Sequence, residues 1–450
     1  MGIIEFNHSA PGTGKTFSVK AQISRDYKRG IKYKTLFLVP LKSLRQRERY
    51  DLIRTFGVKP QDVHILKGKN EAGCSLLRNS YNILASLVLC SKCPSKNCLY
   101  RQLIKHYLDA SDGIWIGDHR FLPFSVFGHA KRVIVDEYDA LLPNYFFQPI
   151  SQGEFEALLR AGVITKRDIE KLYKKGMILQ RNGTLYVASS FFIVNVAIYA
   201  SQVKMLSATP FPDPYLIIKV FIYDPEEQPI SDKLVIAFEN EEVKIRIPNP
   251  YVPSNVKIRG YYIPRKVFMR SPDRMKLIRE FIPEIVSKLN GKITIIAGSK
   301  AEMHRVRYIL EKKLPHIKIA SEDVPEYSLL DQANVRIITV AGRLSRGWDL
   351  DSYAVIALWQ YDRPDEAIQK IQLYDEIFPQ VGGLQLYKYM QYRRHIQTLF
   401  RTIRRYDRQH LLILLDRSWY NALSYFPTTR FLVEKGYLQP SVGFKPFSYS

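Results

Sequence analysis

The stretch Ser9-Ala-Pro-Gly-Thr-Gly-Lys15-Thr16 decides the fold of this 450-residue chain. It lies between an apolar run, Ile3 to Asn7, that predicts a strand, and a helical pattern from Gly14 to Tyr27. A glycine-rich turn in this context directs backbone N–H groups toward phosphates at a helix N-terminus. We therefore predict a phosphate-binding loop made of Ser9, Ala10, Pro11, Gly12, Thr13, Gly14, Lys15 and Thr16. An ordinary glycine-rich turn is the alternative.

Within this loop, Lys15 would supply a point charge to the β- and γ-phosphates, and the Thr16 hydroxyl would ligate Mg²⁺. A second motif, Val133-Ile-Val-Asp136-Glu137-Tyr-Asp139, is an apolar strand that ends in acids. At the carboxyl end of a parallel strand, Asp136 can hold Mg²⁺ and Glu137 can orient or deprotonate a water. Acids at strand ends are often only solvated, but together with the loop they predict ATP hydrolysis.

Short apolar runs alternate with helical patterns in two parts of the chain, which is typical of parallel α/β sheets. The runs that predict strands beyond the loop are residues 35–40, 113–117, 133–135, 205–209, 292–298, 317–320, 335–340, 353–358 and 411–415. We therefore predict an α/β protein with two parallel-sheet domains, residues 1–215 and 266–450.

Three segments interrupt the alternation, namely residues 67–112, 144–203 and 216–265. The last is predicted to be a linker with β character, because residues 210–264 hold nine of the 25 prolines. In the middle segment, Ser151 to Glu154 and Thr165 to Asp168 resemble capping boxes, and Asn182-Gly183 suits a two-residue hairpin. These elements fit either a winged-helix-like unit or, as we favour, a helical insertion with a β-ribbon.

The composition predicts a polyanionic partner. The chain has 67 Lys and Arg against 43 Asp and Glu, a formal net charge of +24, and a pI near 9.7. Clustered basic residues bind phosphates by releasing counterions, but composition does not separate DNA from RNA. No run approaches the roughly 18 apolar residues of a membrane span, and the N-terminus lacks the pattern of a signal peptide. We expect a soluble, intracellular (cytoplasmic) protein.

All four cysteines, Cys74, Cys90, Cys93 and Cys98, fall within 25 residues. In a chain that is not secreted, such a cluster predicts a metal site before it predicts disulfides. Four thiolates suit a structural zinc or a [4Fe-4S] cluster equally well by spacing, and unligated core thiols are a third interpretation.

The motifs together resemble the ordered blocks of superfamily 2 helicases. The phosphate loop and Asp136 to Asp139, which looks like the DEAD/DEAH box, are joined by further matching blocks at Val39 to Leu44, Ser207 to Thr209, Ile296 to Ser299, Gly342 to Asp349 and Gln397 to Arg404. The resemblance implies two RecA-like domains. It also implies that Gly347 and Asp349 contribute to the nucleotide site, and that Arg401 and Arg404 are arginine fingers for the transferred phosphate.

The four cysteines lie between the block at Val39 to Leu44 and the acidic motif at Asp136 to Asp139. A four-cysteine insertion at this place resembles the XPD- and DinG-like iron-sulfur helicases, of which this chain would be a small or truncated member. This resemblance favours a [4Fe-4S] cluster over zinc, and it makes 144–203 a small counterpart of the family's arch. It implies travel 5′ to 3′ on single-stranded and forked DNA, with the cluster as a wedge. We also expect a monomer, although the sequence itself does not define the oligomeric state. A remodeller or translocase that uses ATP without separating strands is the alternative.

Three positions depart from the family pattern. Asp139 stands where the family has His, and Arg346 replaces a Glu. In the block from Gln397 to Arg404, which matches the family's QxxGRxxR pattern, Phe400 replaces the Gly. The basic stretch from Arg393 to Arg408 also suits a solvated or DNA-facing helix. Its aromatic neighbours, such as Tyr387 and Tyr389, would either stack on bases or pack against the sheet.

Overall fold

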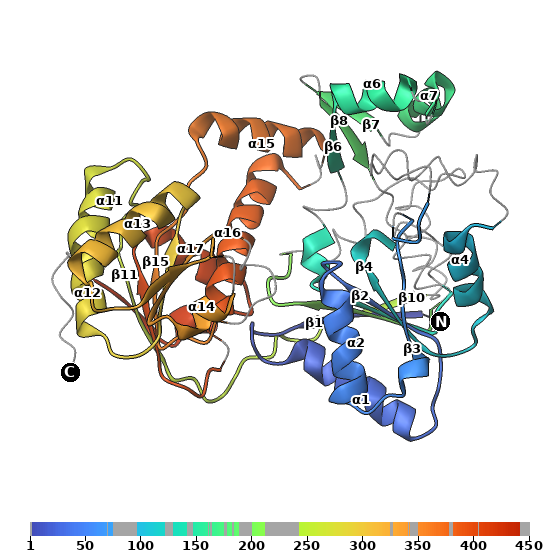
Figure 1. Cartoon of the computed structure of the whole chain (residues 1–450), viewed down its shortest axis with the longest axis horizontal. Helices are drawn as coiled ribbons and strands as arrows, with labels where there is room; N and C mark the ends of the chain where they lie inside the picture. Colours follow the sequence, from blue (N-terminus) through green and yellow to red (C-terminus); the bar gives the residue numbers. More distant parts are fainter. Residues whose placement is uncertain are drawn as a thin grey trace. The chain divides into compact units, whose positions relative to one another are not determined.

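The computed structural model describes residues 2–69, 71–74, 97–121, 129–141, 147–160, 162, 164–174, 178–181, 184–188, 200–211, 243–324, 327–340, 342, 350–377, 381–403 and 405–441. The chain forms two units (Figure 1). The first comprises residues 1–7, 15–207 and 213–248, and the second comprises residues 8–14, 208–212 and 249–450. Among the described residues, no helix has both the length and the apolar character that a membrane span requires.

The first unit is built on a seven-stranded sheet with the order β10-β1-β9-β5-β2-β4-β3. Its strands are β1 (Gly2–His8), β2 (Thr35–Val39), β3 (Val63–Ile65), β4 (Ile114–Asp118), β5 (Arg132–Asp136), β9 (Gln202–Ser207) and β10 (Val243–Arg246). Each pair whose register is resolved runs parallel. The central strands β2 and β4 are buried along their whole length, as expected for a parallel sheet covered on both faces.

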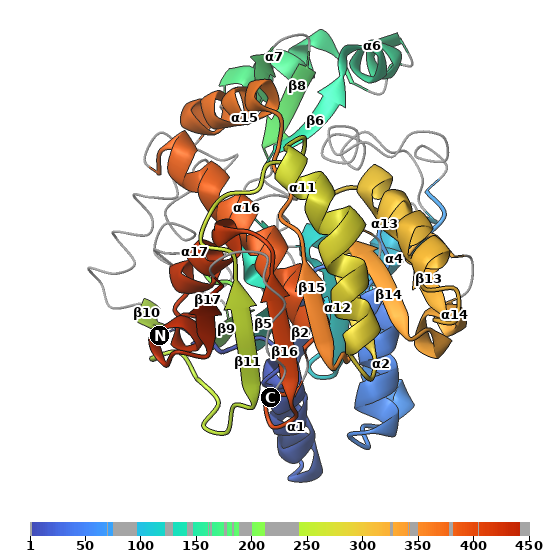
Figure 2. The same cartoon turned by 90° about the vertical axis from the view of Figure 1, so that its left-hand side faces the viewer.

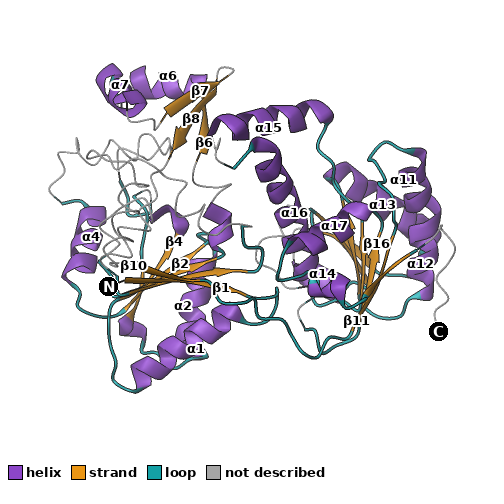
Figure 3. Ribbon diagram, turned by 180° about the vertical axis from the view of Figure 1, so that it is seen from behind, coloured by secondary structure: helices purple, strands orange, loops and turns teal. Residues whose placement is uncertain are grey.

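Helices α1 (Lys15–Lys28) and α2 (Leu44–Arg54) lie on one face of this sheet (Figure 3). Val19 and Ile23 of α1 and Leu52 of α2 share an apolar core with strand residues such as Phe37 and Ile134. Helix α4 (Leu99–Asp109) packs Tyr107 edge-on against Trp115 of β4, with ring centroids 5.2 Å apart. Short 3₁₀ turns lie at Pro60–Asp62, His119–Phe121 and Tyr138–Ala140.

The predicted insertion between residues 144 and 203 forms a small antiparallel sheet with two helices. The sheet has the order β6-β8-β7, and its elements are β6 (Phe147–Ser151), α6 (Gln152–Arg160), α7 (Lys166–Lys174), β7 (Ile178–Arg181) and β8 (Thr184–Ala188). Both capping boxes are confirmed, because Ser151 and Glu154 exchange hydrogen bonds, as do Thr165 and Asp168. Arg181 pairs with Thr184, which confirms the hairpin, although residues 182–183 lie outside the described residues.

The second unit is built on a seven-stranded sheet of order β13-β14-β12-β15-β16-β11-β17, in which all six pairs are parallel. Its strands are β11 (Ile258–Tyr262), β12 (Ile293–Ala297), β13 (Ile319–Ser321), β14 (Val335–Thr339), β15 (Ala354–Ala357), β16 (His410–Leu414) and β17 (Leu438–Pro440).

Helices cover both faces of the second sheet (Figures 2 and 3). They are α11 (Pro272–Lys276), a π-helical segment (Leu277–Phe281), α12 (Ile282–Lys288), α13 (Lys300–Lys313), α14 (Tyr327–Gln332), α15 (Pro364–Ile377), α16 (Gly383–Arg401), α17 (Arg417–Tyr425) and α18 (Phe431–Glu434). The core on the α12 and α13 face includes Ile285, Val306 and Ile295, all at most 2% exposed.

The predicted α/β class with two parallel sheets is therefore confirmed. The segment that the sequence assigns to a linker, residues 216–265, also contributes to both sheets. β10 pairs with β1 in the first sheet, and β11 pairs with β16 and β17 in the second. β10 alternates apolar and polar residues over four positions only, and both strands lie among prolines, so the sequence indicates β character without indicating a sheet partner.

Candidate functional site

The predicted phosphate loop joins the end of β1 to the start of α1, as its sequence requires. Gly12 and Gly14 have φ angles of 78° and 80°, a left-handed conformation that other residues rarely adopt. The backbone N–H and the hydroxyl of Thr13 both donate to the carbonyl oxygen of Ala10, at 3.3 and 2.7 Å. The loop thus folds back on itself and leads directly into the N-terminus of a 14-residue helix.

Thr16 and Asp136 meet at the carboxyl end of β5. The Thr16 hydroxyl lies 3.1 Å from each carboxylate oxygen of Asp136. Burial, Glu137 and Glu48 raise the pKa of Asp136 to about 7, while Lys15 and the Thr16 hydrogen bond oppose this rise. The largest cause is burial, which disfavours the charged carboxylate. A divalent cation beside this hydroxyl and carboxylate would favour the charged form.

Glu137 follows in a left-handed backbone conformation, with φ 49° and ψ 51°. Among the described residues it is the one non-glycine residue with a positive φ. This conformation costs a residue with a side chain on the order of 1–3 kcal/mol, and it persists where the surrounding structure enforces it. The strained backbone thus belongs to the residue whose carboxylate is predicted to activate the water.

Asp139 closes the acidic motif inside the protein. It is fully buried and accepts a hydrogen bond of 2.8 Å from the Ser207 hydroxyl at the end of β9. The position that departs from the family's His thus forms a serine–aspartate bond between the acidic motif and the Ser207 block. The departure at Asp139 is visible in the sequence, but its bond to Ser207 could not be predicted, because 68 residues separate Asp139 from Ser207.

Residues 208–211 pack within the second unit against α16. The hydroxyl of Tyr389 donates to the carbonyl oxygen of Thr209 at 3.1 Å, and the side-chain amide of Gln397 donates to the Thr209 hydroxyl at 3.2 Å. Phe211 packs edge-on against the Tyr389 ring, with centroids 4.7 Å apart. Thr209, the last residue of the Ser207 block, is therefore hydrogen-bonded to Gln397, the first residue of the second block.

The aromatic residues of α16 have partners within the second unit. Tyr389 is fully buried, Tyr387 donates its hydroxyl to Asp362, and Tyr392 packs edge-on against Trp359. The packed-helix interpretation is confirmed for the buried Tyr389, and base stacking by the partly exposed Tyr387 and Tyr392 stays a prediction. Phe400 is 1% exposed, so an aromatic core residue occupies the position where the family has Gly.

The remaining predicted site residues divide between described and undescribed parts of the chain. Arg401 ends α16 with partial exposure, whereas Arg404, Arg346, Gly347 and Asp349 lie outside the described residues. Cys74 and Cys98 are free, partly exposed thiols, and Cys90 and Cys93 also lie outside. Within the described part of the chain, no group of three or more His, Cys, Asp or Glu side chains could hold a metal ion.

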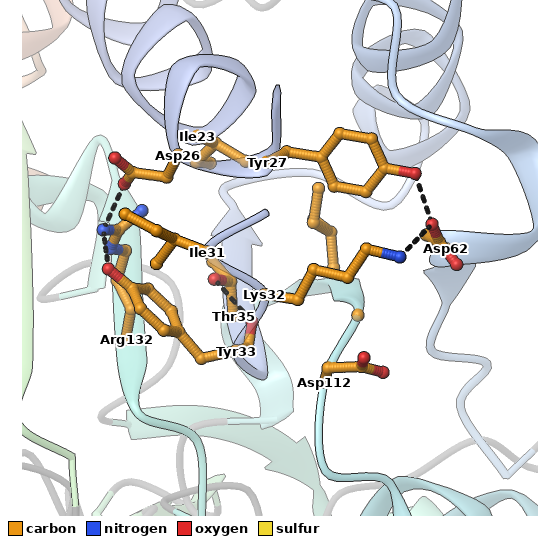
Figure 4. A pocket seen from close by; sticks show the side chains of 12 residues that line it. Ile23, Asp26, Tyr27, Ile31, Lys32, Tyr33, Thr35, Asp62, Asp112 and Arg132 are labelled. Carbon is orange, nitrogen blue, oxygen red and sulfur yellow. Dashed lines mark hydrogen bonds and ion pairs between the residues drawn. The ribbon is translucent and has the colours of Figure 1, made fainter. Parts of the chain in front are cut away.

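A separate small pocket lies at the C-terminal end of α1 (Figure 4). Arg132 pairs with Asp26 at 2.7 Å, and Asp62 accepts from Tyr27 and lies 3.5 Å from the Lys32 ammonium. None of the predicted site residues line this pocket. Its main charged groups pair with one another, so we assign it a structural role.

Comparison with known proteins identifies the fold of this chain but does not assign it to a family. No protein-family model matches the sequence, and no curated protein matches it. The solved structure of S. tokodaii Xpd4 superposes with a TM-score of 0.53 at 11% identity, covering 98% of this chain and 96% of the other. An XPD helicase structure gives 0.56 at 13% identity with the same coverage, and an apo XPD structure gives 0.52 at 14%, covering 94% and 95%. The chain therefore shares the fold of these structures, with two RecA-like domains.

Proposed function

We propose that this chain hydrolyses ATP to drive separation of DNA strands, as a helicase that travels 5′ to 3′. The observation that carries the proposal is the arrangement of Thr16, Asp136 and Glu137 at the carboxyl edge of a parallel sheet, directly after a glycine-rich loop. Nucleotides bind at this edge in open α/β sheets. The fold of two RecA-like units, shared with XPD structures, supports the same function.

The phosphate loop would hold the nucleotide through its backbone N–H groups and through Lys15. Thr16 and Asp136 would hold Mg²⁺, and their pairing at 3.1 Å fits that role. Mg²⁺, when bound, would neutralise charge on the β- and γ-phosphates. The raised pKa of Asp136 supports this assignment, since a divalent cation would favour the charged carboxylate.

Glu137 would act on the water that attacks the γ-phosphorus. The water oxygen forms a new bond to phosphorus, the bond to the bridging oxygen of ADP breaks, and the carboxylate of Glu137 accepts the proton. The left-handed backbone of Glu137 supports this role, because strained residues that are kept in a fold cluster at functional sites.

The link from hydrolysis to movement would run through the Ser207 block. Ser207 contacts the acidic motif through Asp139 in the first unit, and the next two residues belong to the second unit, where Tyr389, Gln397 and Thr428 hold them. A segment with partners on both sides can transmit a change at one end to the other. Arg401 and Arg404 remain the proposed arginine fingers, and Gly347 and Asp349 the proposed further nucleotide contacts.

The preference for DNA, the 5′ to 3′ direction and the monomeric state are proposals by likeness to the XPD fold. The net charge of +24 supports a nucleic-acid partner of either kind. The test is strand separation on duplexes with a 5′ or a 3′ single-stranded tail, with Glu137→Gln as the blank. We expect unwinding of the 5′-tailed duplex alone. Unwinding from a 3′ tail would contradict the direction, and ATP turnover without unwinding would favour the remodeller.

We also propose that Cys74, Cys90, Cys93 and Cys98 bind a [4Fe-4S] cluster that stiffens a wedge at the fork. Two of the four thiols are described, and both are free, as cluster ligands must be. Iron content and visible absorbance of anaerobically purified protein would distinguish the cluster from zinc. Cys90→Ser should lose iron and unwinding but keep some ATP hydrolysis. Intact unwinding by an iron-free Cys90→Ser protein would contradict the wedge.

A further inference from the structure

Tyr251 lies directly beside the first residue of the phosphate loop. Its backbone N–H donates to the carbonyl oxygen of His8 at 3.0 Å, and its carbonyl oxygen accepts from the N–H of Ala10 at 3.0 Å. Ser9 and Tyr251 therefore form an isolated parallel bridge. Because residues paired in this way place their side chains on the same face, the Tyr251 side chain lies next to that of Ser9.

The Tyr251 side chain is exposed to solvent and has no ring partner among the described residues. The residue is 61% exposed, whereas Ser9 and Ala10 beside it are buried. Among the described residues, no ring stacking, cation–π contact or side-chain hydrogen bond involves Tyr251. Phe17, the other exposed aromatic side chain near the loop, already packs on Phe56 with ring centroids 5.0 Å apart.

An exposed tyrosine is common on protein surfaces and carries no meaning alone. Here, two backbone hydrogen bonds fix its position against the loop that would hold the phosphates. A nucleotide bound by its phosphates leaves its ribose and base to lie on the surface beside the loop. A tyrosine ring has few rotatable bonds, so stacking a base on it costs little conformational entropy.

We propose that Tyr251 is the stacking platform for the nucleotide base, a proposal that rests on the proposed ATP site. Stacking on an aromatic face is tolerant of base identity, because every base offers a π-face. Tyr251 therefore contributes affinity for the base without selecting adenine. Tyr251 contributes similarly to the affinities for ATP and GTP. It contributes nothing to the affinity for inorganic tripolyphosphate, which has no base.

The test compares three ligands by titration calorimetry with Mg²⁺ on the full chain, in a Glu137→Gln background that prevents turnover. The ligands are ATP, GTP and inorganic tripolyphosphate. Tyr251→Ala should weaken ATP and GTP by roughly tenfold, within the range for loss of one base stack, and leave tripolyphosphate unchanged. Tyr251→Phe, which keeps the ring, should bind all three ligands as the unsubstituted chain does.

Tyr308→Ala is the matched control, since Tyr308 is 66% exposed on α13 and lies outside the loop. It should change none of the three affinities. Unchanged ATP affinity in Tyr251→Ala would overturn the proposal, and so would an equal loss of ATP and tripolyphosphate, because that pattern means damage to the loop. If the unsubstituted chain bound neither ATP nor tripolyphosphate, the ATP site itself would fail and the platform with it. Binding of both by the unsubstituted chain, with no effect of Tyr251→Ala, would leave the ATP site standing and remove only the platform.

Discussion

At the scale of single residues, the carboxylates of the candidate site differ because their surroundings differ. Asp139 is fully buried and bonded to Ser207, Glu137 is held in a left-handed conformation, and Asp136 has a pKa raised to about 7. Three acids within four positions thus have three different environments. The sequence could identify them as a group, but it could not assign these environments, because Ser207 and Glu48 are distant in the chain.

The raised pKa of Asp136 predicts a pH-dependent stability. Since its folded pKa lies above the ordinary value near 4, protonation favours the folded state, and this contribution is lost as the pH rises from about 4 through about 7. Without Mg²⁺, Asp136→Asn should therefore melt at a higher temperature than the unsubstituted chain at about pH 8, with little difference at about pH 5. Added Mg²⁺ at the higher pH should stabilise the unsubstituted chain and not the variant.

Asp62 offers a control of opposite sign, measured by the same thermal melts. A hydrogen bond from Tyr27, together with Lys32, lowers the pKa of Asp62, so its contribution to stability is present at neutral pH and is lost in acid (Figure 4). Asp62→Asn should melt below the unsubstituted chain at about pH 8. If Asp136→Asn also melted below the unsubstituted chain at that pH, the assigned environment of Asp136 would be wrong.

At the scale of elements, α16 explains why an aromatic residue stands at position 400. Phe400 is 1% exposed near the C-terminal end of this helix and contacts the ring of Tyr406. Phe400→Gly, which introduces the residue of the helicase pattern, should therefore destabilise the fold. Removing a buried Phe side chain costs about 3–5 kcal/mol, and Gly in a helix adds about 1 kcal/mol relative to Ala.

Urea unfolding would measure this cost. Leu384→Ala is the control on the same helix, because Leu384 is 65% exposed and its change should stay within about 0.5 kcal/mol. A Phe400→Gly protein within about 1 kcal/mol of the unsubstituted chain would show that the position is not part of the core.

Elements with strong local patterns were predictable, and those defined by distant partners were not. The strands at 293–297, 335–339 and 354–357 follow apolar runs, and both capping boxes and the hairpin follow short motifs. β10 and β11 were missed as sheet members because pairing with β1 and β16 defines them, rather than their own composition. The pairing of Tyr251 with Ser9 escaped prediction for the same reason.

At the scale of the whole molecule, the sequence predicted two parallel sheets, and the structure confirms them. The positions of the glycine-rich loop and of the acidic motif in the fold could be predicted, because each follows a strand whose apolar pattern is clear. The contacts of residues 208–211 with α16 could not, because they join segments about 180 residues apart. The excess of basic residues predicted a polyanionic partner without indicating which surface binds it.

We propose above all that Thr16, Asp136 and Glu137 form an ATP-hydrolysing site that nucleic acid controls. Steady-state phosphate release, with and without single-stranded DNA, tests it most directly in the unsubstituted chain and in Glu137→Gln. We expect hydrolysis that DNA stimulates, and a loss of at least about 100-fold in Glu137→Gln with ATP binding retained, since general-base catalysis contributes roughly 10²–10⁴-fold. Hydrolysis that survives Glu137→Gln at the full rate, or no hydrolysis by the unsubstituted chain with DNA and Mg²⁺ present, would contradict the account.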